Sequence, residues 1–112
     1  MMNKNRPKRG DIVLCDFSPT AGHEQSGLRP ALVLTGVDLT NFTNMIIVCP
    51  ITSRARGNYF ETSINTHKTK GVALIYHLRS IDFRSRKIKI VDQVDKETVR
   101  DVVNKVKVLI ER

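Results

Sequence analysis

Apolar residues in this chain gather into short runs bounded by Gly, Pro or polar residues, a spacing that predicts β-strands. The first run, Asp11–Phe17, follows Gly10 and ends before Ser18-Pro19. Further strands are expected at residues 30–36, 45–52, 59–64, 71–78 and 88–91. Between two of them, residues 38–42 predict a single helical turn with Asp38 as its cap.

The hydrophobic period changes near the C-terminus. From Asp95 onward, apolar residues recur three or four positions apart with Lys and Arg between them: Val99, Val102, Val103, Val106, Leu109 and Ile110. This pattern predicts an amphipathic helix capped by Asp95 and packed on the sheet. Several short strands followed by one helix indicate a mainly β fold, either a strongly bent antiparallel sheet or a small barrel.

The length of 112 residues fits one domain. We expect residues 1–9 to form a flexible basic tail and residues 10–112 a single domain. Hydrophobic residues make up 40% of the chain and aromatics only 5%, so the core must consist of Val, Ile and Leu. A domain this small would gain stability from burial at a subunit interface.

The chain carries 19 Lys and Arg against 11 Asp and Glu, a formal net charge of +8. This excess favours nucleic acid as a partner, the alternative being a basic surface that only keeps the protein soluble. Cys15 and Cys49 lie in apolar runs and predict buried thiols in a reducing compartment rather than a disulfide. No signal-peptide pattern or membrane-length apolar run is found, so a cytoplasmic protein is expected.

A polar segment, residues 20–29, separates the first two strands and is about twice as long as a hairpin needs. Long ordered loops often carry function, and this one holds His23, Glu24 and Gln25. Arg29 follows, and Pro30 restricts it to an extended conformation. The alternatives are a salt-bridging arginine at a strand start and a solvated surface carboxylate at Glu24.

Hydroxyl side chains end the third strand at Thr52 and Ser53, where turn formation is the simpler interpretation. If the second and third strands are neighbours, however, Arg29 and Thr52 meet at one rim. A guanidinium, a hydroxyl and a carboxylate together suit cleavage of RNA by its own 2′-OH. That reaction needs a proton acceptor and stabilisation of the charge on phosphorus.

Other chemistries fit less well. The three histidines are scattered and neither cysteine belongs to a Cys-x-x-Cys pair, so neither a metal site nor a cofactor is expected. His77 either hydrogen-bonds in the core or contacts RNA. A dense basic stretch with Arg79, Arg84 and Arg86 is either a solvated hairpin face or a phosphate track. Residues 53–58 predict a basic loop that carries Arg54 and Arg56.

These residues resemble the MazF/PemK (Kid) family of toxin–antitoxin ribonucleases. The resemblance covers nearly the whole chain from Arg9 onward and is most specific in Gly22-His23-Glu24-Gln25-Ser26-Gly27-Leu28-Arg29-Pro30. Later blocks agree, among them Cys49-Pro50-Ile51-Thr52-Ser53, Gly71-Val72-Ala73-Leu74 and Leu78-Arg79-Ser80-Ile81-Asp82.

The resemblance implies an SH3-like barrel with a C-terminal helix, paired as a homodimer. It also implies metal-independent, sequence-selective cleavage of single-stranded RNA, chiefly mRNA, leaving a 2′,3′-cyclic phosphate and a 5′-OH. The implied partner is an antitoxin of the MazE/PemI type, whose acidic segment would occupy a basic groove.

Carried over by position, Arg29 would stabilise the phosphate and Thr52 would hold it, with Glu24 in the same pocket and His23 and Gln25 shaping it. Some family members place an acidic base where this chain has Tyr76, followed by His77. The proton acceptor is therefore left between Glu24 and His77. Ser53, Arg54, Arg56, His77, Arg79, Arg84 and Arg86 are the expected RNA contacts.

Two functions compete with the ribonuclease. A gyrase poison of the CcdB type shares the fold but predicts an apolar or aromatic C-terminus, whereas this chain ends Ile110-Glu111-Arg112. A module that only binds single-stranded nucleic acid predicts interleaved aromatic residues, of which Phe and Tyr here total six.

Overall fold

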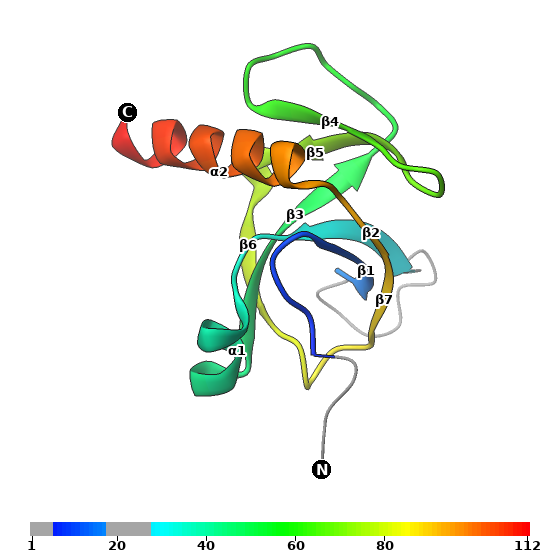
Figure 1. Ribbon diagram of the computed structural model, residues 1–112, viewed down its shortest axis with the longest axis vertical. Helices are drawn as coiled ribbons and strands as arrows, with labels where there is room; N and C mark the ends of the chain where they lie inside the picture. The colour runs from blue at the N-terminus through cyan, green and yellow to red at the C-terminus, as the bar shows by residue number, and fades with distance from the viewer. Residues whose placement is uncertain (1–5, 18–27) are drawn as a thin grey trace.

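The computed structural model describes residues 6–17 and 28–112 (Figure 1). In order, the elements are β1 (Asp11–Asp16), β2 (Leu28–Val33), α1 (Val37–Thr43), β3 (Met45–Thr52), β4 (Glu61–Asn65), β5 (Lys70–Leu74), the 3-10 turn η1 (Ile75–His77), β6 (Arg79–Asp82), β7 (Ile88–Gln93) and α2 (Lys96–Glu111). The expected class, mainly β with a C-terminal helix, is confirmed. No helix within the described ranges is long and apolar enough to cross a membrane.

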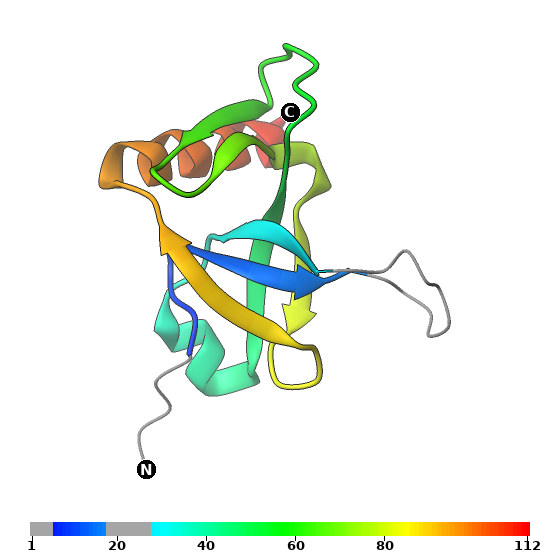
Figure 2. The same cartoon turned by 90° about the vertical axis from the view of Figure 1, so that its right-hand side faces the viewer.

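The strands form one antiparallel sheet in the order β4-β5-β3-β2-β1-β7, and β6 also pairs with β3. β3 changes partners along its length: residues 45–48 pair with β6, whereas Ile51 and Thr52 pair with β5. The sheet therefore curls around its long central strand into a half-open barrel (Figure 2). This matches the small barrel expected from the sequence.

Two apolar clusters fill the two faces of this curved sheet because side chains alternate along each strand. One cluster lies between β1, β2, β3 and β6 and includes Val13, Cys15, Ala31, Val33 and Val48. The other lies under α2 and includes Ile12, Leu32, Cys49, Ile51 and Val102.

The two cysteines belong to these different clusters and are free, which confirms the buried thiols expected from the sequence. Burial raises the pKa of the Cys49 thiol to about 12.

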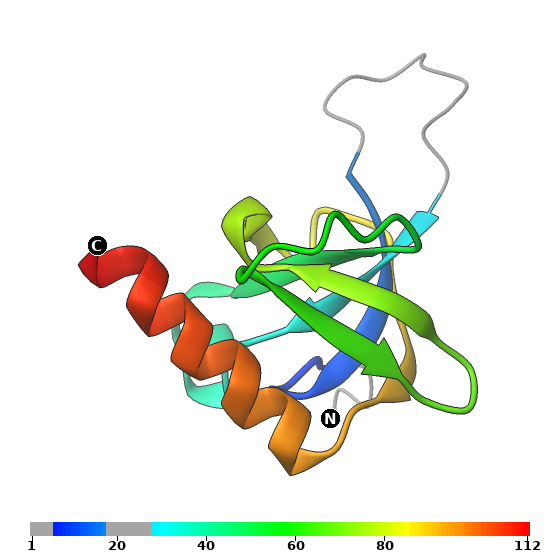
Figure 3. The same cartoon turned by 90° about the horizontal axis from the view of Figure 1, so that it is seen from above.

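The C-terminal helix crosses beside β4 and β5 (Figure 3). Its predicted cap is confirmed, since the Asp95 carboxylate accepts a hydrogen bond from Thr98 N at 2.8 Å. Two contacts attach the helix to β4: Thr62 Oγ1 donates to Asp101 at 2.8 Å, and Lys105 Nζ donates to the carbonyl of Glu61 at 2.7 Å.

The region around residues 71–82 differs from the prediction. The expected strand 71–78 ends at Leu74, because Ile75 turns to donate its backbone N–H to the carbonyl of Phe60 at 2.9 Å. The basic stretch that follows starts with β6, which was not expected. β6 has four residues and only Ile81 is buried, so no apolar alternation marks it.

The expected cap of the first helix was wrong. α1 begins after Gly36, whose backbone is extended, and no side-chain hydrogen bond from the described part of the chain caps it. Asp38 instead lies exposed within the first turn, where a carboxylate still complements the helix dipole.

The domain begins earlier than residue 10. Pro7 is buried, Arg9 Nε donates to the carbonyl of Leu34 at 2.8 Å, and Lys8 N donates to the Asp11 carboxylate at 3.0 Å. Residues 6–9 are thus held on the barrel by side-chain contacts, contrary to the expected flexible tail. Residues 1–5 lie outside the described ranges.

Candidate active site

The β2–β3 ladder determines where Arg29 and Thr52 lie. Its paired residues are Ala31 with Pro50, Leu32 with Cys49 and Val33 with Val48. Arg29 lies two residues before Ala31 and Thr52 two residues after Pro50, so both are at the same end of the ladder. Because side chains two residues apart share a face, both also lie on the face of Ala31 and Val48. The expected convergence at one rim therefore agrees with the register.

Thr52 is the last residue of β3, and its hydroxyl is already oriented. Thr52 Oγ1 accepts a hydrogen bond from the backbone N–H of Arg54 at 3.2 Å. A hydroxyl carries one hydrogen and two lone pairs, so this contact leaves the hydrogen for donation to an acceptor such as a phosphoryl oxygen.

A close backbone approach supports Thr52 from the neighbouring strand. Gly71 of β5 has a φ of +152°, and a Cβ built there would lie 2.5 Å from the carbonyl oxygen of Thr52. Only glycine fits this position without moving the end of β3.

Two further arginines lie near the end of β1. The Arg79 guanidinium stacks over the ring of Phe17, 5.1 Å from its centroid, and Arg86 donates to the carbonyl of Asp16 at 2.8 Å. Both are close to Cys15, which lies directly opposite Arg29 in the β1–β2 ladder. Burial raises the pKa of the Cys15 thiol, and the charges of Arg86 and Arg79 offset part of that rise.

The loop after Thr52 carries the first basic stretch. Ser53, Arg54 and Arg56 are all exposed there. The backbone of this loop is held by Glu61, a buried carboxylate that sequence reasoning missed because an acidic residue near a strand start is usually solvated.

Of the other predicted residues, Arg84 lies away from this group. Arg84 lies in the turn between β6 and β7, where Nη1 is 3.5 Å from Asn44 Oδ1, next to the opposite end of β3 from Thr52. His77 ends η1 and is exposed, with its ring against Tyr76 at 4.8 Å between centroids. His23, Glu24 and Gln25 lie outside the described residues.

The residues brought together suit an anionic phosphate. The guanidiniums of Arg29, Arg79 and Arg86 supply positive charge at one end of the barrel, and the Thr52 hydroxyl supplies a neutral donor. Within residues 6–17 and 28–112, no three His, Cys, Asp or Glu side chains lie close enough to hold a metal ion.

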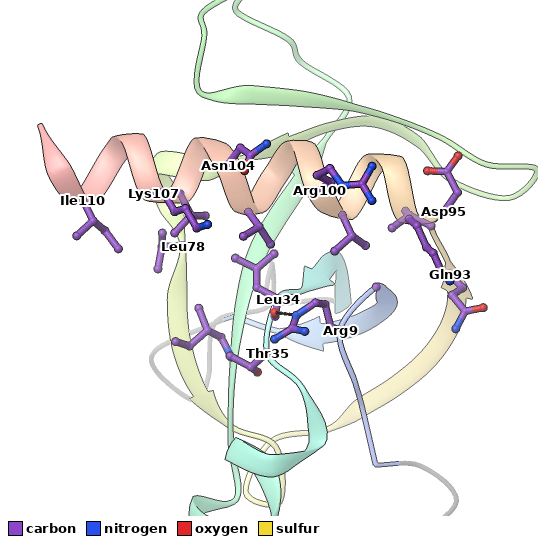
Figure 4. Close-up of a pocket in the computed structure, with 17 residues that line it drawn as sticks. Arg9, Leu34, Thr35, Leu78, Gln93, Asp95, Arg100, Asn104, Lys107 and Ile110 are labelled. Atoms are coloured by element: carbon purple, nitrogen blue, oxygen red, sulfur yellow. Dashed lines mark hydrogen bonds between the residues drawn. The ribbon is translucent and has the colours of Figure 1, made fainter.

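A separate apolar groove of about 1190 Å³ runs along α2 (Figure 4). Leu34 and Ile47, which line it, belong to the cluster under α2, on the face opposite Ala31 and Val48 and therefore opposite Arg29 and Thr52. It is lined by the apolar residues Leu34, Ile47, Leu78 and Val103 and by the basic residues Arg9, Arg100 and Lys107. Ile110, at one end, is 73% exposed.

Comparison with known proteins matches nearly the whole chain. The family described as "PemK-like, MazF-like toxin of type II toxin-antitoxin system" matches residues 8–110. The chain is 36% identical over 110 residues to the endoribonuclease toxin MazF of Escherichia coli K12, covering 98% of this chain and 99% of the relative. It is 35% identical over 117 residues to the endoribonuclease toxin ChpB of the same organism, covering 99% and 100%.

Solved structures agree with the sequence matches. A crystal structure of MazF from Deinococcus radiodurans is 38% identical, covers 95% of this chain and 97% of the other, and gives a TM-score of 0.83. A MazE–MazF structure from the same organism is also 38% identical, covers 95% and 96%, and gives a TM-score of 0.86. The chain therefore belongs to the PemK-like, MazF-like toxin family of type II toxin–antitoxin systems.

Proposed function

We propose that the chain is an endoribonuclease toxin that cleaves single-stranded RNA, chiefly mRNA, at selected sequences. The observation that carries this proposal is the common end and face of Arg29 and Thr52, with Arg79 and Arg86 nearby. The curated relatives, named as endoribonucleases, support it. Poisoning of gyrase does not require a phosphate-binding group of this kind.

The proposed reaction is attack by the RNA 2′-OH on the adjacent phosphorus. The 2′-oxygen–phosphorus bond forms and the bond from phosphorus to the 5′-oxygen breaks, leaving a 2′,3′-cyclic phosphate and a 5′-OH. A base takes the 2′-OH proton, and the leaving 5′-oxygen gains one. In this proposal Arg29 stabilises the charge on the phosphoryl oxygens and supplies that proton, and Thr52 donates to one of those oxygens. The base is Glu24 or His77.

Contacts to the rest of the RNA are proposed for the surrounding basic and polar residues. Arg79 and Arg86 bind phosphates that flank the cleavage site. Ser53, Arg54 and Arg56, in the loop after Thr52, contact the neighbouring RNA. His77 and the adjacent Tyr76 offer an aromatic surface on which an unpaired nucleobase of the RNA can stack. The family resemblance adds His23 and Gln25. Arg84 contacts RNA only if the strand extends to the other end of β3.

The proposed partner is an antitoxin of the MazE type with an acidic segment. The MazE–MazF structures of similar proteins support this partner, as does the net charge of +8. Binding of an acidic chain over the arginines would block the phosphate site by charge pairing. We place both proteins in the cytoplasm, where mRNA is available.

The homodimer implied by the family resemblance is also part of this proposal, with the groove along α2 as the contact between two copies. Replacing the exposed Ile110 by Glu is expected to shift the protein from dimer to monomer in sedimentation velocity, because a carboxylate would enter an apolar contact. Phe42→Glu is the matched control: Phe42 is 87% exposed on α1, away from the groove, and this variant should remain a dimer. Two variants with the same sedimentation coefficient would contradict the groove as the contact.

The activity is tested by incubating purified protein with a labelled RNA in excess EDTA and sequencing the fragment ends. We expect cleavage at a short preferred sequence, with 2′,3′-cyclic phosphate and 5′-OH ends, since the proposed groups need no metal. RNA that shifts in a gel but stays intact would favour a binding module. Intact RNA with inhibited gyrase supercoiling would favour the gyrase poison.

A further inference from the structure

Glu61, the first residue of β4, is a buried carboxylate with an unusual set of partners. It is 8% exposed, and its oxygens accept hydrogen bonds from the backbone N–H of Arg56 at 3.0 and 3.1 Å and of Gly57 at 2.9 Å. The ion pairs found in the described part of the chain are Lys8–Asp11 and Lys105–Asp101, and neither involves Glu61. Its charge is therefore balanced mainly by the amide dipoles of the loop.

The loop that Glu61 holds is the one that leaves Thr52. Near its start, the N–H of Arg54 donates to Thr52 Oγ1. Further along, Gly57 adopts a φ of +78°, which turns the chain, and Asn58 Oδ1 accepts from Phe60 N at 2.8 Å. The backbone of residues 53–58 is thus fixed by side chains on both sides, and Arg54 and Arg56 remain exposed on it.

The Glu61 carboxylate is not needed to attach β4 to the rest of the fold. β4 pairs with β5 over all five of its residues, from Glu61 with Leu74 to Asn65 with Lys70. Thr62 and the backbone carbonyl of Glu61 bind α2 through Asp101 and Lys105. Within the described ranges, every hydrogen bond that the carboxylate accepts comes from the loop.

We propose that Glu61 is a positioning residue that holds loop 53–58 in the shape in which Arg54 and Arg56 bind RNA next to the scissile phosphate. This inference rests on the proposed function and adds a residue that decides how tightly, and at which sequence, RNA is held. Glu61 acts through the loop and not on the reacting atoms. Its loss should therefore change substrate binding more than the chemical step.

The test is Glu61→Gln in the full-length protein, assayed on an RNA with one cleavage site. With the Gln amide oxygen in the place of Oε1, the N–H groups of Arg56 and Gly57 keep only a neutral acceptor, and the amide NH₂ replaces Oε2 opposite the Arg56 N–H. The variant therefore loses the charge of the acceptor and the second contact to Arg56. We expect KM to rise about tenfold, in line with the loss of hydrogen bonds to a charged group, and kcat to change less than about twofold. Preference among target sequences should weaken, and the amide hydrogens of Arg56 and Gly57 should exchange faster.

Thr62→Val is the matched control. It removes the hydrogen bond to Asp101 from the adjacent residue of the same strand, without touching the loop. Both variants should lose some thermal stability, but only Glu61→Gln should raise KM. In a background of Arg54→Ala and Arg56→Ala, adding Glu61→Gln should change KM little, since the guanidiniums that the loop positions are gone.

The outcomes distinguish a failure of the positioning role from a failure of the proposed function. If the natural protein cleaves RNA and Glu61→Gln leaves KM and the two exchange rates unchanged, the positioning role is wrong. If Glu61→Gln and Thr62→Val raise KM equally, the effect is general destabilisation and the inference is again wrong. If the natural protein neither cleaves nor binds RNA, the proposed function fails and the inference fails with it.

Discussion

Replacing Arg29 by Ala is expected to lower kcat for RNA cleavage by about 10²- to 10³-fold, the usual effect of removing one preorganised donor from a developing oxyanion. Arg29 lies at the same end and on the same face of the β2–β3 ladder as Thr52, and the phosphate would sit between them. Because Arg29 is exposed, the free energy of unfolding should change by less than about 0.5 kcal/mol. Single-turnover cleavage and urea denaturation measure the two effects.

Two companion variants separate charge from geometry. Arg29→Lys keeps the charge but loses the planar fork, so its rate should fall between those of the natural protein and Arg29→Ala. Arg112→Ala removes the same charge at the end of α2 and should cleave at the natural rate. Cleavage by Arg29→Ala at the rate of the Arg112→Ala control would mean that Arg29 does not bind the reacting phosphate.

Replacing Gly71 by Ala is expected to reduce both stability and activity. The new Cβ would lie 2.5 Å from the Thr52 carbonyl oxygen and 3.3 Å from Ile51 Cγ2, and the φ of +152° disfavours any side chain. Overpacking of this kind costs about 1–3 kcal/mol. The end of β3 must move to relieve the clash, and a displacement of a positioned group by about 1 Å can lower a rate about 100-fold. Chemical denaturation and kcat of the folded fraction measure the two losses.

Gly10→Ala serves as the stability control for this prediction. Gly10 also has a positive φ, +95°, but an added Cβ there meets its nearest neighbour, Val99 Cγ2, at an ordinary 3.4 Å. Its loss of stability should therefore reflect backbone strain alone and be smaller. A Gly71→Ala protein as stable as Gly10→Ala, and as active as the natural protein, would show that β3 and β5 adjust without moving Thr52.

Much of the fold follows from periodicity, and the exceptions have local causes. The strands around Val13, Val33 and Val48 are marked by apolar runs, and α2 by its three- and four-residue spacing and the Asp95 cap. β6 could not be predicted because only backbone groups pair it with β3, and because Arg79 and Ser80 make its sequence polar. The turn at Ile75–His77 depends on a carbonyl fifteen residues before Ile75, that of Phe60.

Part of the candidate site could likewise be predicted from the sequence, and part could not. The convergence of Arg29 and Thr52 could be predicted because neighbouring strands of an antiparallel sheet share their ends. The stacking of Arg79 on Phe17 could not, since the two residues are joined by a sheet curvature that no local pattern encodes. The role of Glu61 could not be predicted either, because its partners are backbone N–H groups, which no particular residue type in the sequence marks.

The β2–β3 ladder ends before the loop that follows Thr52, and this separation has a consequence for how such toxins diversify. Arg29 and Thr52 are aligned by the β2–β3 ladder, which is complete before the chain enters loop 53–58. Exchanges in the part of that loop beyond Arg54, whose N–H donates to Thr52 Oγ1, leave both the ladder and this contact intact, so the target sequence can evolve while the cleavage chemistry is inherited unchanged. Grafting the corresponding loop of a relative between Arg54 and Glu61 is therefore a direct route to a ribonuclease with a new preference.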